Sequence, residues 1–306
     1  MQLRYLEYLD ALAHARHFAR AAAACNVSQP GLSAGIRKLE AEVGVQIVKR
    51  GRRFEGFTPE GERVLHVARR MIAERAALHQ DLTSMKGAMS GTLRIGAIPT
   101  ALTALSLLTK PFCDEHPLVH LAVYSLSSEE IVHQLSEFEL DVGLTYVDGE
   151  PLGTVRTVPL YEERFLLLTP RDSRIAEQES VGWAQLAGLP LCLLSSNMQN
   201  RRILQRNVAE AGVTITPKLE SDTISVLYDH VSAHNWSTVI TEAWLKALGV
   251  PDGMRAIPMD KPRRSYHVGM VLADREPAPL LARALLDVTQ RLDLPSEFAQ
   301  ASASVR

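Results

Sequence analysis

The segment 28–43, SQPGLSAGIRKLEAEV, constrains the possible fold more than any other stretch of the chain. Ser28 is placed to cap a helix, and Pro30 stands in the first turn, where its missing N–H group costs nothing. The following apolar residues recur at helical spacing and predict a buried face made of Leu32, Ile36 and Leu39. The segment is therefore predicted to be a helix with one face in a core and the other free for a partner.

This helix is the second of a closely spaced pair. An alanine-rich helix is predicted over residues 18–25, and Asn26 is placed to close it. Two short helices joined by a tight turn form the helix-turn-helix arrangement. Residues 45–59, VQIVKRGRRFEGFTP, then predict two short strands around a basic tip that contains glycine, which is a wing.

The same helix contains GLSAG, which matches the G-x-S-x-G pattern of serine hydrolases. A nucleophile of that kind needs a buried strand directly before the serine, so that a sharp turn exposes the hydroxyl. Here the preceding residues 21–30 are helix-forming and then turn-forming, and no Asp and His follow in settings that complete a triad. Ser33 is therefore expected on an exposed helix face, and its context argues against the hydrolase alternative.

The outward stripe of the second helix suits the major groove of DNA. Gln29, Ser33 and Arg37 are spaced four residues apart, so they share one face. Glutamine can pair with adenine, serine with several base edges, and arginine with guanine or phosphate. Free N–H groups at the helix start suit a phosphate, as do the basic wing and the cap of the next helix. The predicted DNA-binding residues are Ser28, Gln29, Pro30, Ser33, Arg37, Lys49, Arg50, Arg52, Arg53 and Thr58.

The charge distribution agrees with a polyanionic partner for the N-terminal part alone. Residues 1–90 contain 14 Lys and Arg against 9 Asp and Glu, a net charge of +5, which leaves −7 for residues 91–306. A basic module attached to an acidic body indicates that the module binds a polyanion. A merely solvated basic face is the alternative.

A long helix is predicted to begin after Thr58, with Pro59 in its first turn. Its apolar residues alternate spacings of three and four over about three heptads, which is the pattern of a coiled-coil seam, interrupted by Arg75. We therefore expect a dimerisation helix, and a helix packed on its own domain is the alternative. The predicted dimerisation residues are Val64, Ala68, Met71, Leu78, Leu82 and Met85.

Beyond residue 90 the sequence alternates strand and helix patterns. Repeated β-α units predict mostly parallel sheets with helices on both faces, and about 215 residues favour two lobes with a cleft between them. The predicted domains are a winged helix-turn-helix at 1–58, a linker helix and hinge at 59–90, and a two-lobed α/β domain at 91–306. Lobe I is expected at about 91–163 and 268–306, and lobe II at about 164–267.

The chain resembles LysR-type transcriptional regulators over the series AAAACNVSQPGLSAGIRKLEAEVGVQIVKR, followed by TPEG. The shared pattern combines the capped S-Q-P helix start, the Leu39-Glu40 pair, a glycine, the basic wing and T-P-x-G at fixed spacing. The resemblance extends over the whole chain and implies an effector domain similar to type 2 periplasmic solute-binding proteins. It also implies a homotetramer on two adjacent DNA half-sites, in which a small coinducer changes DNA bending and the contact with RNA polymerase.

Three positions depart from that family's pattern. Ala34 and Gly35 stand where members commonly have a pair of long basic or polar residues, and Val48 replaces an aromatic residue before the wing. A glycine inside a helix costs about 1 kcal/mol relative to alanine. Either base readout relies more on the outward stripe, or this helix approaches DNA unusually closely.

Four helices of the two-lobed domain are predicted to start with hydroxyl or amide groups directly after strands. Ligands in such folds bind at the carboxyl ends of strands, and polar groups at helix N-termini suit a small anion, with Arg201 or Arg202 as an added charge. Ordinary capping is the alternative for each hydroxyl, as in the capping box expected for Ser127 and Glu130, and Trp236 either narrows the cleft or fills a core. With the family resemblance included, the predicted effector-binding residues are Thr100, Ala101, Thr103, Ser127, Ser128, Asn197, Met198, Gln199, Asn200, Arg201, Trp236 and Ser237.

Composition argues against several other classes of protein. The three cysteines form no C-x-x-C pair and the ten histidines are scattered, so we expect no metal, no cofactor and no disulfide framework. No stretch is long and apolar enough for a membrane helix. The N-terminus contains Glu7 and Asp10 where an export signal needs an apolar run, which argues for the cytoplasm and against a solute-binding protein of a transport system.

We therefore predict a regulator of transcription that is not an enzyme. Its expected partners are double-stranded DNA, a small organic anion as effector, RNA polymerase and further copies of the same chain. Tyr146 and Tyr228 are expected to be packing residues without a functional role.

Overall fold

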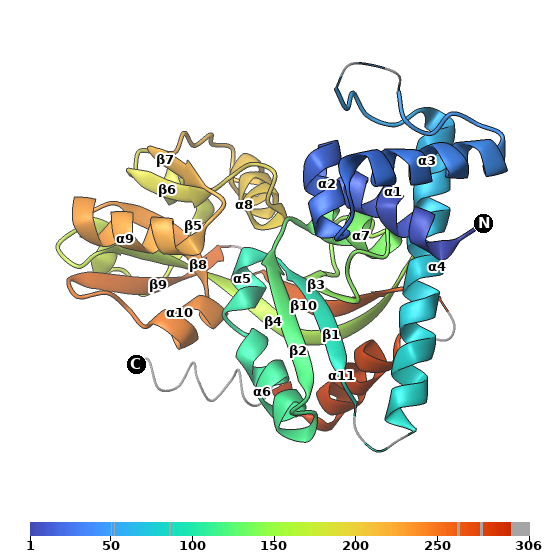
Figure 1. Cartoon of the computed structure of the whole chain (residues 1–306). Coiled ribbons are helices and arrows are strands. Elements are labelled where there is room, and N and C mark those ends of the chain that lie inside the picture. The colour runs from blue at the N-terminus through green and yellow to red at the C-terminus, as the bar shows by residue number, and fades with distance from the viewer. Residues whose placement is uncertain are drawn as a thin grey trace. The chain divides into compact units, whose positions relative to one another are not determined.

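The computed structural model describes residues 1–49, 51, 53–85, 87, 89–261, 264–275 and 278–294. The chain divides into two compact units, the first made of Met1–Met89 with Ser136–Glu139, and the second of Ser90–Leu135 with Leu140–Arg306. Figure 1 shows a helical first unit and an α/β second unit. No helix among the described residues is long and apolar enough to span a lipid bilayer.

The first unit is built on α1 (Leu3–Ala15), α2 (Phe18–Ala24) and α3 (Gln29–Val43). Its core contains leucines from the inner faces of these helices, and Leu9, Leu12, Leu32 and Leu39 are completely buried. The helical periodicity of the sequence predicted the buried face of α3 correctly, since Leu32, Ile36 and Leu39 are all buried.

The helix ends follow local sequence signals. The Ser28 Oγ accepts a hydrogen bond of 3.2 Å from the Gly31 N–H at the start of α3. Gly44 ends α3 in the left-handed conformation with φ 74°, which glycine adopts without steric cost. Both predicted signals are confirmed.

Gly35 faces the interior of the first unit rather than a DNA surface. A Cβ atom on this residue would lie 2.7 Å from the ring of Tyr8 and 3.0 Å from the ring of Tyr5. The glycine therefore permits close packing of α3 on α1, which offsets its unfavourable helix propensity. This observation corrects the idea that Gly35 marks an unusually close approach to DNA.

The wing is shorter than predicted. Instead of two strands, the described residues form one antiparallel bridge between Val48 and Phe57, flanked by a hydrogen bond of 3.0 Å from the Lys49 N–H to the Gly56 carbonyl. Lys49 and Arg53 are exposed. Arg50 and Arg52, also predicted to bind DNA, lie outside the described residues.

The long helix α4 (Pro59–Ser84) begins at the predicted cap, where the Thr58 Oγ1 accepts a hydrogen bond of 2.9 Å from the Gly61 N–H. Gly61 touches the backbone of the preceding segment, since a Cβ atom on it would lie 2.1 Å from the Ile47 carbonyl oxygen. The start of α4 is therefore joined directly to the base of the wing.

The predicted seam on α4 divides into two parts. Ala68 is fully buried and Val64 packs on the core of the first unit, so these two residues serve that core, which corrects their assignment to a seam presented to another chain. Arg75 pairs with Glu7 of α1 at 2.6 Å. The remaining members of the seam are large exposed hydrophobic residues, namely Met71, Leu78, Leu82 and Met85.

Lobe I of the second unit contains β1 (Gly91–Ala97), β2 (Val119–Ser125), β3 (Val142–Tyr146) and β10 (Ser265–Ala273), followed in the sheet by β4 (Val155–Pro170). β1 pairs in parallel with β2 and β3, whereas β10 is antiparallel to β3 and β4. Its helices are α5 (Pro99–Leu102), α6 (Leu105–Glu115), α7 (Ser128–Ser136) and α11 (Leu280–Arg291).

Lobe II contains the short strand β5 (Val181–Gly182) together with β6 (Leu191–Leu194), β7 (Leu219–Ser221), β8 (Ser237–Thr241) and β9 (Met254–Lys261). Two short 3₁₀ helices (Arg174–Glu177 and Trp183–Leu186) precede its helices α8 (Gln199–Glu210), α9 (Ile224–His234) and α10 (Glu242–Leu248). The core of this lobe is apolar and includes Leu168, Cys192, Val231 and Trp244.

The strand β4 belongs to both lobes. Its residues up to Arg164 pair with β10 of lobe I, and its residues from Phe165 pair with β8 and β9 of lobe II. The two lobes are therefore connected through one continuous strand, and residues near Glu163 lie where the strand changes partners.

Candidate functional site

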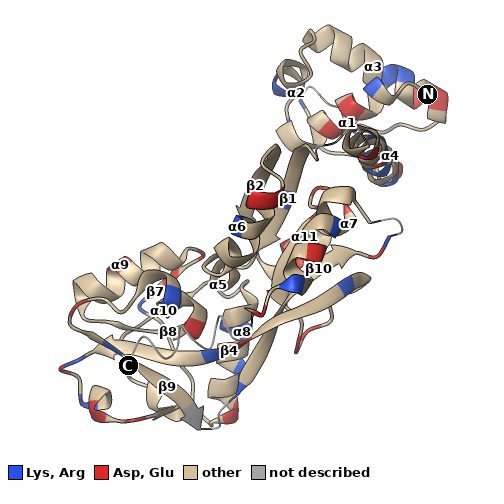
Figure 2. Cartoon of the chain, turned by 90° about the horizontal axis from the view of Figure 1, so that it is seen from below, with Lys and Arg blue, Asp and Glu red and all other residues tan. Residues whose placement is uncertain are grey.

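The outer face of α3 presents the predicted base-reading residues. Gln29, Pro30 and Arg37 are exposed, whereas Ser33 is half-buried on the same side of the helix. Figure 2 shows basic residues on α3. The Ser28 Oγ uses its acceptor capacity for the Gly31 N–H, so its own hydrogen remains available to a phosphate oxygen.

Ser33 has no features of an activated nucleophile. It lies inside α3, after α2 and a turn rather than after a strand. A nucleophile elbow requires a strand-to-helix turn at the serine. The geometry therefore agrees with the sequence argument against hydrolysis.

Glu40 links α3 to the wing, a role that the sequence argument did not assign. Its carboxylate accepts hydrogen bonds from the Ile47 N–H at 2.8 Å and from the Val48 N–H at 3.1 Å. The wing base is thereby fixed relative to α3.

The hydroxyl of Thr58 is already used within the protein. Besides capping α4, Thr58 Oγ1 donates to the Gln46 carbonyl at 2.6 Å. With its donor and acceptor sites engaged in this way, Thr58 is better explained as the link between the wing and α4 than as the predicted phosphate ligand.

A buried polar cluster lies around Tyr146 in the second unit. The Tyr146 hydroxyl donates to the Glu163 carboxylate at 2.6 Å and accepts a hydrogen bond of 2.9 Å from the Asn200 side chain. Glu163 also accepts from Thr241 Oγ1 at 3.3 Å. These side chains come from β3, β4, α8 and β8, so the cluster connects lobe I to lobe II. Tyr146, expected to serve only in packing, is its centre.

Glu163 is 1% exposed. Burial raises the pKa of its carboxyl group to about 7, although the hydrogen bonds from Tyr146 and Thr241 act in the opposite direction. The carboxylate of Glu242 adds a smaller unfavourable charge. The carboxyl group therefore titrates near neutral pH, unlike an exposed glutamate.

Three predicted effector residues have a buried polar side-chain atom that lacks a hydrogen-bond partner among the described residues, namely Thr100 Oγ1, Gln199 Oε1 and Arg201 Nε. Thr100 Oγ1 lies beside Tyr146. The three residues are each 2% exposed. Buried polar groups are nearly always satisfied by protein, water or a ligand, so these atoms indicate a place for a small polar group.

Other predicted effector residues have structural partners. Ser127 and Glu130 form the expected capping box, with bonds of 2.8 and 3.2 Å, and the Ser128 Oγ accepts from Thr145 Oγ1 at 2.7 Å. Met198 lies in the apolar core of lobe II, and Ala101 of lobe I is completely buried. The Ser237 hydroxyl is bonded to that of Thr169 at 2.8 Å. Asn197 is exposed.

Both arginines that were expected to supply a charge for an anion contact a carboxylate, and the Nε atom of Arg201 has no partner among the described residues. Arg201 bonds Glu220 at 2.7 Å, and Arg202 binds both oxygens of Glu150 at 2.9 and 2.6 Å. Bidentate pairs of this kind are strong, so an anionic ligand would have to compete with a carboxylate already present. Trp236 stacks on His234 with 4.6 Å between ring centroids, which favours packing over narrowing of a cleft.

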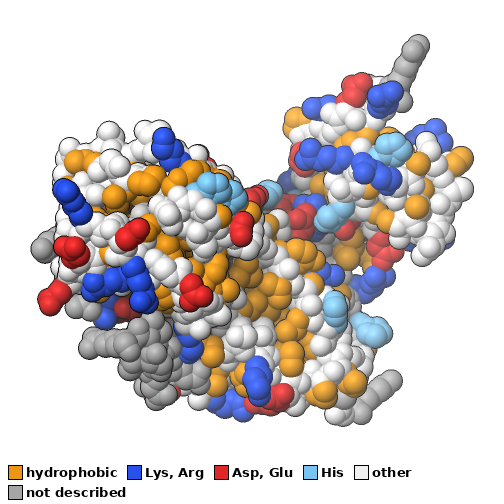
Figure 3. Space-filling view, turned by 90° about the vertical axis from the view of Figure 1, so that its left-hand side faces the viewer, with side chains coloured by type: hydrophobic (Ala, Val, Ile, Leu, Met, Phe, Trp, Pro, Cys, Tyr) orange, Lys and Arg blue, Asp and Glu red, His pale blue; other side chains and the backbone are white. Residues whose placement is uncertain are grey.

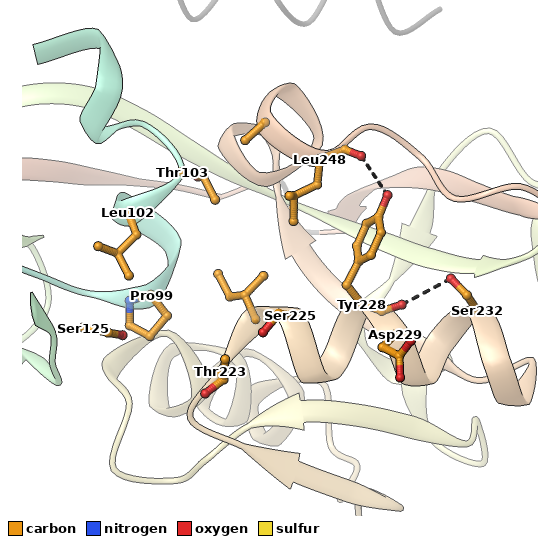
Figure 4. Close-up of a pocket in the computed structure, with 12 residues that line it drawn as sticks. Pro99, Leu102, Thr103, Ser125, Thr223, Ser225, Tyr228, Asp229, Ser232 and Leu248 are labelled. Atoms are coloured by element: carbon orange, nitrogen blue, oxygen red, sulfur yellow. Dashed lines mark hydrogen bonds between the residues drawn. The ribbon is translucent and has the colours of Figure 1, made fainter. Parts of the chain in front are cut away.

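A cavity of about 760 Å³ opens between α5 of lobe I and α9 and α10 of lobe II. Figure 4 shows its lining residues. Thr103 is the one predicted effector residue among them, and Tyr228, expected to serve only in packing, forms part of its wall.

The chain matches the models of two protein families. Residues 3–62 match "Bacterial regulatory helix-turn-helix protein, lysR family", and residues 86–293 match "LysR substrate binding domain". The chain belongs to the LysR family of bacterial transcriptional regulators.

Individual relatives extend over nearly the whole chain. The DNA-binding transcriptional dual regulator OxyR of Escherichia coli K12 is 33% identical over 289 residues, or 92% of each chain. The hydrogen peroxide-inducible genes activator of Dickeya chrysanthemi is 31% identical over 284 residues, again 92% of each chain. A solved full-length OxyR variant from Pseudomonas aeruginosa, with one cysteine replaced by aspartate, has a TM-score of 0.76 at 26% identity and covers 97% of each chain. The predicted fold class is confirmed.

Proposed function

We propose that the chain reads specific DNA sequences with α3, assembles through the exposed seam of α4, and controls transcription in response to a small molecule bound between the lobes. In this proposal it has no catalytic activity, acts in the cytoplasm as a homotetramer and contacts RNA polymerase. The observation that supports it most directly is the outward stripe of Gln29, Ser33 and Arg37 on a helix that is rigidly capped and packed.

The expected effect of Arg37→Ala tests the DNA-reading surface. Loss of an arginine that reads a guanine edge is expected to weaken binding to the cognate operator by about 1–3 kcal/mol, with a smaller loss on random DNA. The measurement is fluorescence anisotropy of the full chain on both duplexes at several salt concentrations.

Lys110→Ala is the matched control, because it removes a positive charge from the exposed surface of α6. It is expected to leave operator affinity unchanged. Equal losses on operator and random DNA for Arg37→Ala would mean that Arg37 contacts phosphate only.

The effector is proposed to act across the Tyr146 cluster. Thr100 and Gln199 place unsatisfied buried oxygens beside a network that joins β3, β4 and α8. A ligand that engages them would change the contacts between lobes, and a small molecule shifts an equilibrium only through such differential contacts.

Thiol oxidation is the second candidate signal, because several relatives are named for induction by hydrogen peroxide. Peroxide reacts with thiolates, so a sensing cysteine needs exposure and a low pKa. Cys192 is fully buried and burial raises the pKa of its thiol to about 11, and burial also raises the pKa of Cys25. Cys113 is partly buried on α6. We therefore propose that thiol oxidation is not the signal in this chain.

Hydrogen peroxide is accordingly expected to change operator affinity by less than about twofold, since no thiolate of raised reactivity is proposed. The comparison is the same anisotropy measurement on the chain and on a variant with Cys25→Ser, Cys113→Ser and Cys192→Ala. A larger change that the cysteine-free variant lacks would establish thiol sensing instead.

A further inference from the structure

The cavity between α5, α9 and α10 is large enough for a small organic molecule. Its volume of about 760 Å³ lies within the range of ligand pockets. Figure 3 shows hydrophobic side chains gathered in a hollow of the second unit. Of the effector-binding residues predicted from the sequence, only Thr103 is among the described residues that line this cavity.

The cavity has apolar walls and one fixed aromatic ring. Pro99 and Leu102 form the side from lobe I, opposite Leu248 of lobe II. Ile224 of α9 also lines the cavity. The ring of Tyr228 stands between α9 and α10, and its hydroxyl donates to the Leu248 carbonyl at 2.8 Å. The hydroxyl is thus directed away from a ligand, while the ring itself remains as a wall.

Asp229 is the one charged side chain among the described residues that line the cavity. It is exposed, and no ion pair or hydrogen bond joins its carboxylate to another described side chain. Asp252 adds a second negative charge near Tyr228, where it assists burial in raising the pKa of the phenol. The electrostatic environment therefore repels an anion.

The N-terminus of α9 is the one feature that would favour an anion here. Asp222 already supplies a carboxylate at that position, where its Oδ1 accepts a hydrogen bond of 3.0 Å from Thr223 Oγ1. The charge of Asp222 opposes that of the helix end, although no side chain caps α9 by a hydrogen bond, and Asp229 is the charged side chain that lines the cavity itself.

We propose that this cavity binds an organic ammonium ion with an apolar body, with Asp229 as its counter-ion and the ring of Tyr228 as a cation–π partner. The aliphatic or aromatic body of the ligand lies against Pro99, Leu102 and Ile224. This inference rests on the proposed function, since it assigns a ligand class to a cavity of the effector domain. The lining of this cavity contains neither Thr100 nor Gln199, and a cation is proposed here in place of the anion expected from the sequence.

The test compares three probes that share a phenylethyl body by isothermal titration calorimetry on the full chain: phenethylamine, 2-phenylethanol and 3-phenylpropionate. Phenethylamine is expected to bind at least about tenfold more tightly than the carboxylate, with the alcohol between them, because the end groups on the shared body are cationic, neutral and anionic, respectively. Equal or tighter binding of 3-phenylpropionate, or no binding of any probe, overturns the proposal.

Two variants locate the site. Asp229→Lys is expected to weaken phenethylamine binding on the order of tenfold or more, because it reverses the local charge. Asp172→Lys makes the same change at an exposed position outside the cavity, and this control is expected to have no effect on binding. Ser225→Trp, which fills the cavity from α9, is expected to abolish binding of all three probes. Unchanged phenethylamine binding in Asp229→Lys or Ser225→Trp assigns the amine to another place and overturns the proposal.

Operator binding by the same preparations separates this inference from the proposed function. A chain that binds its operator but not phenethylamine refutes the ligand assignment alone. A chain that fails to distinguish operator from random DNA refutes the proposed function, whatever the calorimetry gives.

Discussion

Replacing Leu78 and Leu82 together with glutamate is expected to dissociate the oligomer that the LysR fold forms. Leu78 is 59% exposed and Leu82 53% exposed in the single chain, where no described residue covers them. Each leucine buried by a second copy contributes about 1.5–3 kcal/mol, and a symmetric pair loses four of them. The association constant is expected to fall by several orders of magnitude, and light scattering is expected to record a lower mass.

A matched control adds the same charges to another face of the same helix. Ala76→Glu with Gln80→Glu places two carboxylates one turn apart and away from the seam. This control is expected to retain the original mass. If both double variants have the wild-type mass, the seam on α4 is not the interface.

Replacing Glu163 with glutamine is expected to abolish a large pH dependence of stability. The pKa of Glu163 is about 7 in the folded protein, against 4.5 as its ordinary value. The folded chain therefore retains a proton that the unfolded chain has lost, so the free energy of unfolding decreases as the pH rises from about 4.5 to about 7. The difference between the two pKa values corresponds to about 3 kcal/mol.

Urea unfolding of the second unit between about pH 5 and pH 8 measures this effect. Relative to wild type, Glu163→Gln is expected to gain about 2–3 kcal/mol of stability over that interval, because an amide does not titrate. Glu179→Gln, at an exposed position of lobe II, is expected to follow the wild-type pH profile. If the free energy of unfolding of Glu163→Gln changed with pH in the same way as that of the wild type, Glu163 would be excluded as the titrating group.

Local signals in the sequence were sufficient to predict where the helices start and which face of α3 is directed outward. Ser28, Thr58 and the Ser127–Glu130 pair each act within one helical turn, so their spacing alone determines the hydrogen bonds that they make. The outward direction of Gln29 and Arg37 follows from the period of the helix in the same way.

The rest depended on contacts between residues far apart in the chain. Gly35 is explained by two tyrosines of α1, and Arg201 is paired with a glutamate on β7. No spacing rule reveals such partners, and for that reason Arg201 was expected to be free to bind an anion. The hydrogen bonds of Tyr146 and Tyr228 could not be predicted for the same reason, since both depend on which element packs beside them.

The contact of Gly61 with the Ile47 carbonyl has a mechanical consequence. A joint in which backbone touches backbone has no side chain that can change rotamer and absorb a rotation. Any torsion applied along α4 is therefore transmitted to the wing base, and Glu40 passes it on to α3. In a dimer, a small twist of the two α4 helices would change the distance between the two α3 helices. A change in the seam would therefore alter the spacing of the DNA half-sites that the dimer fits.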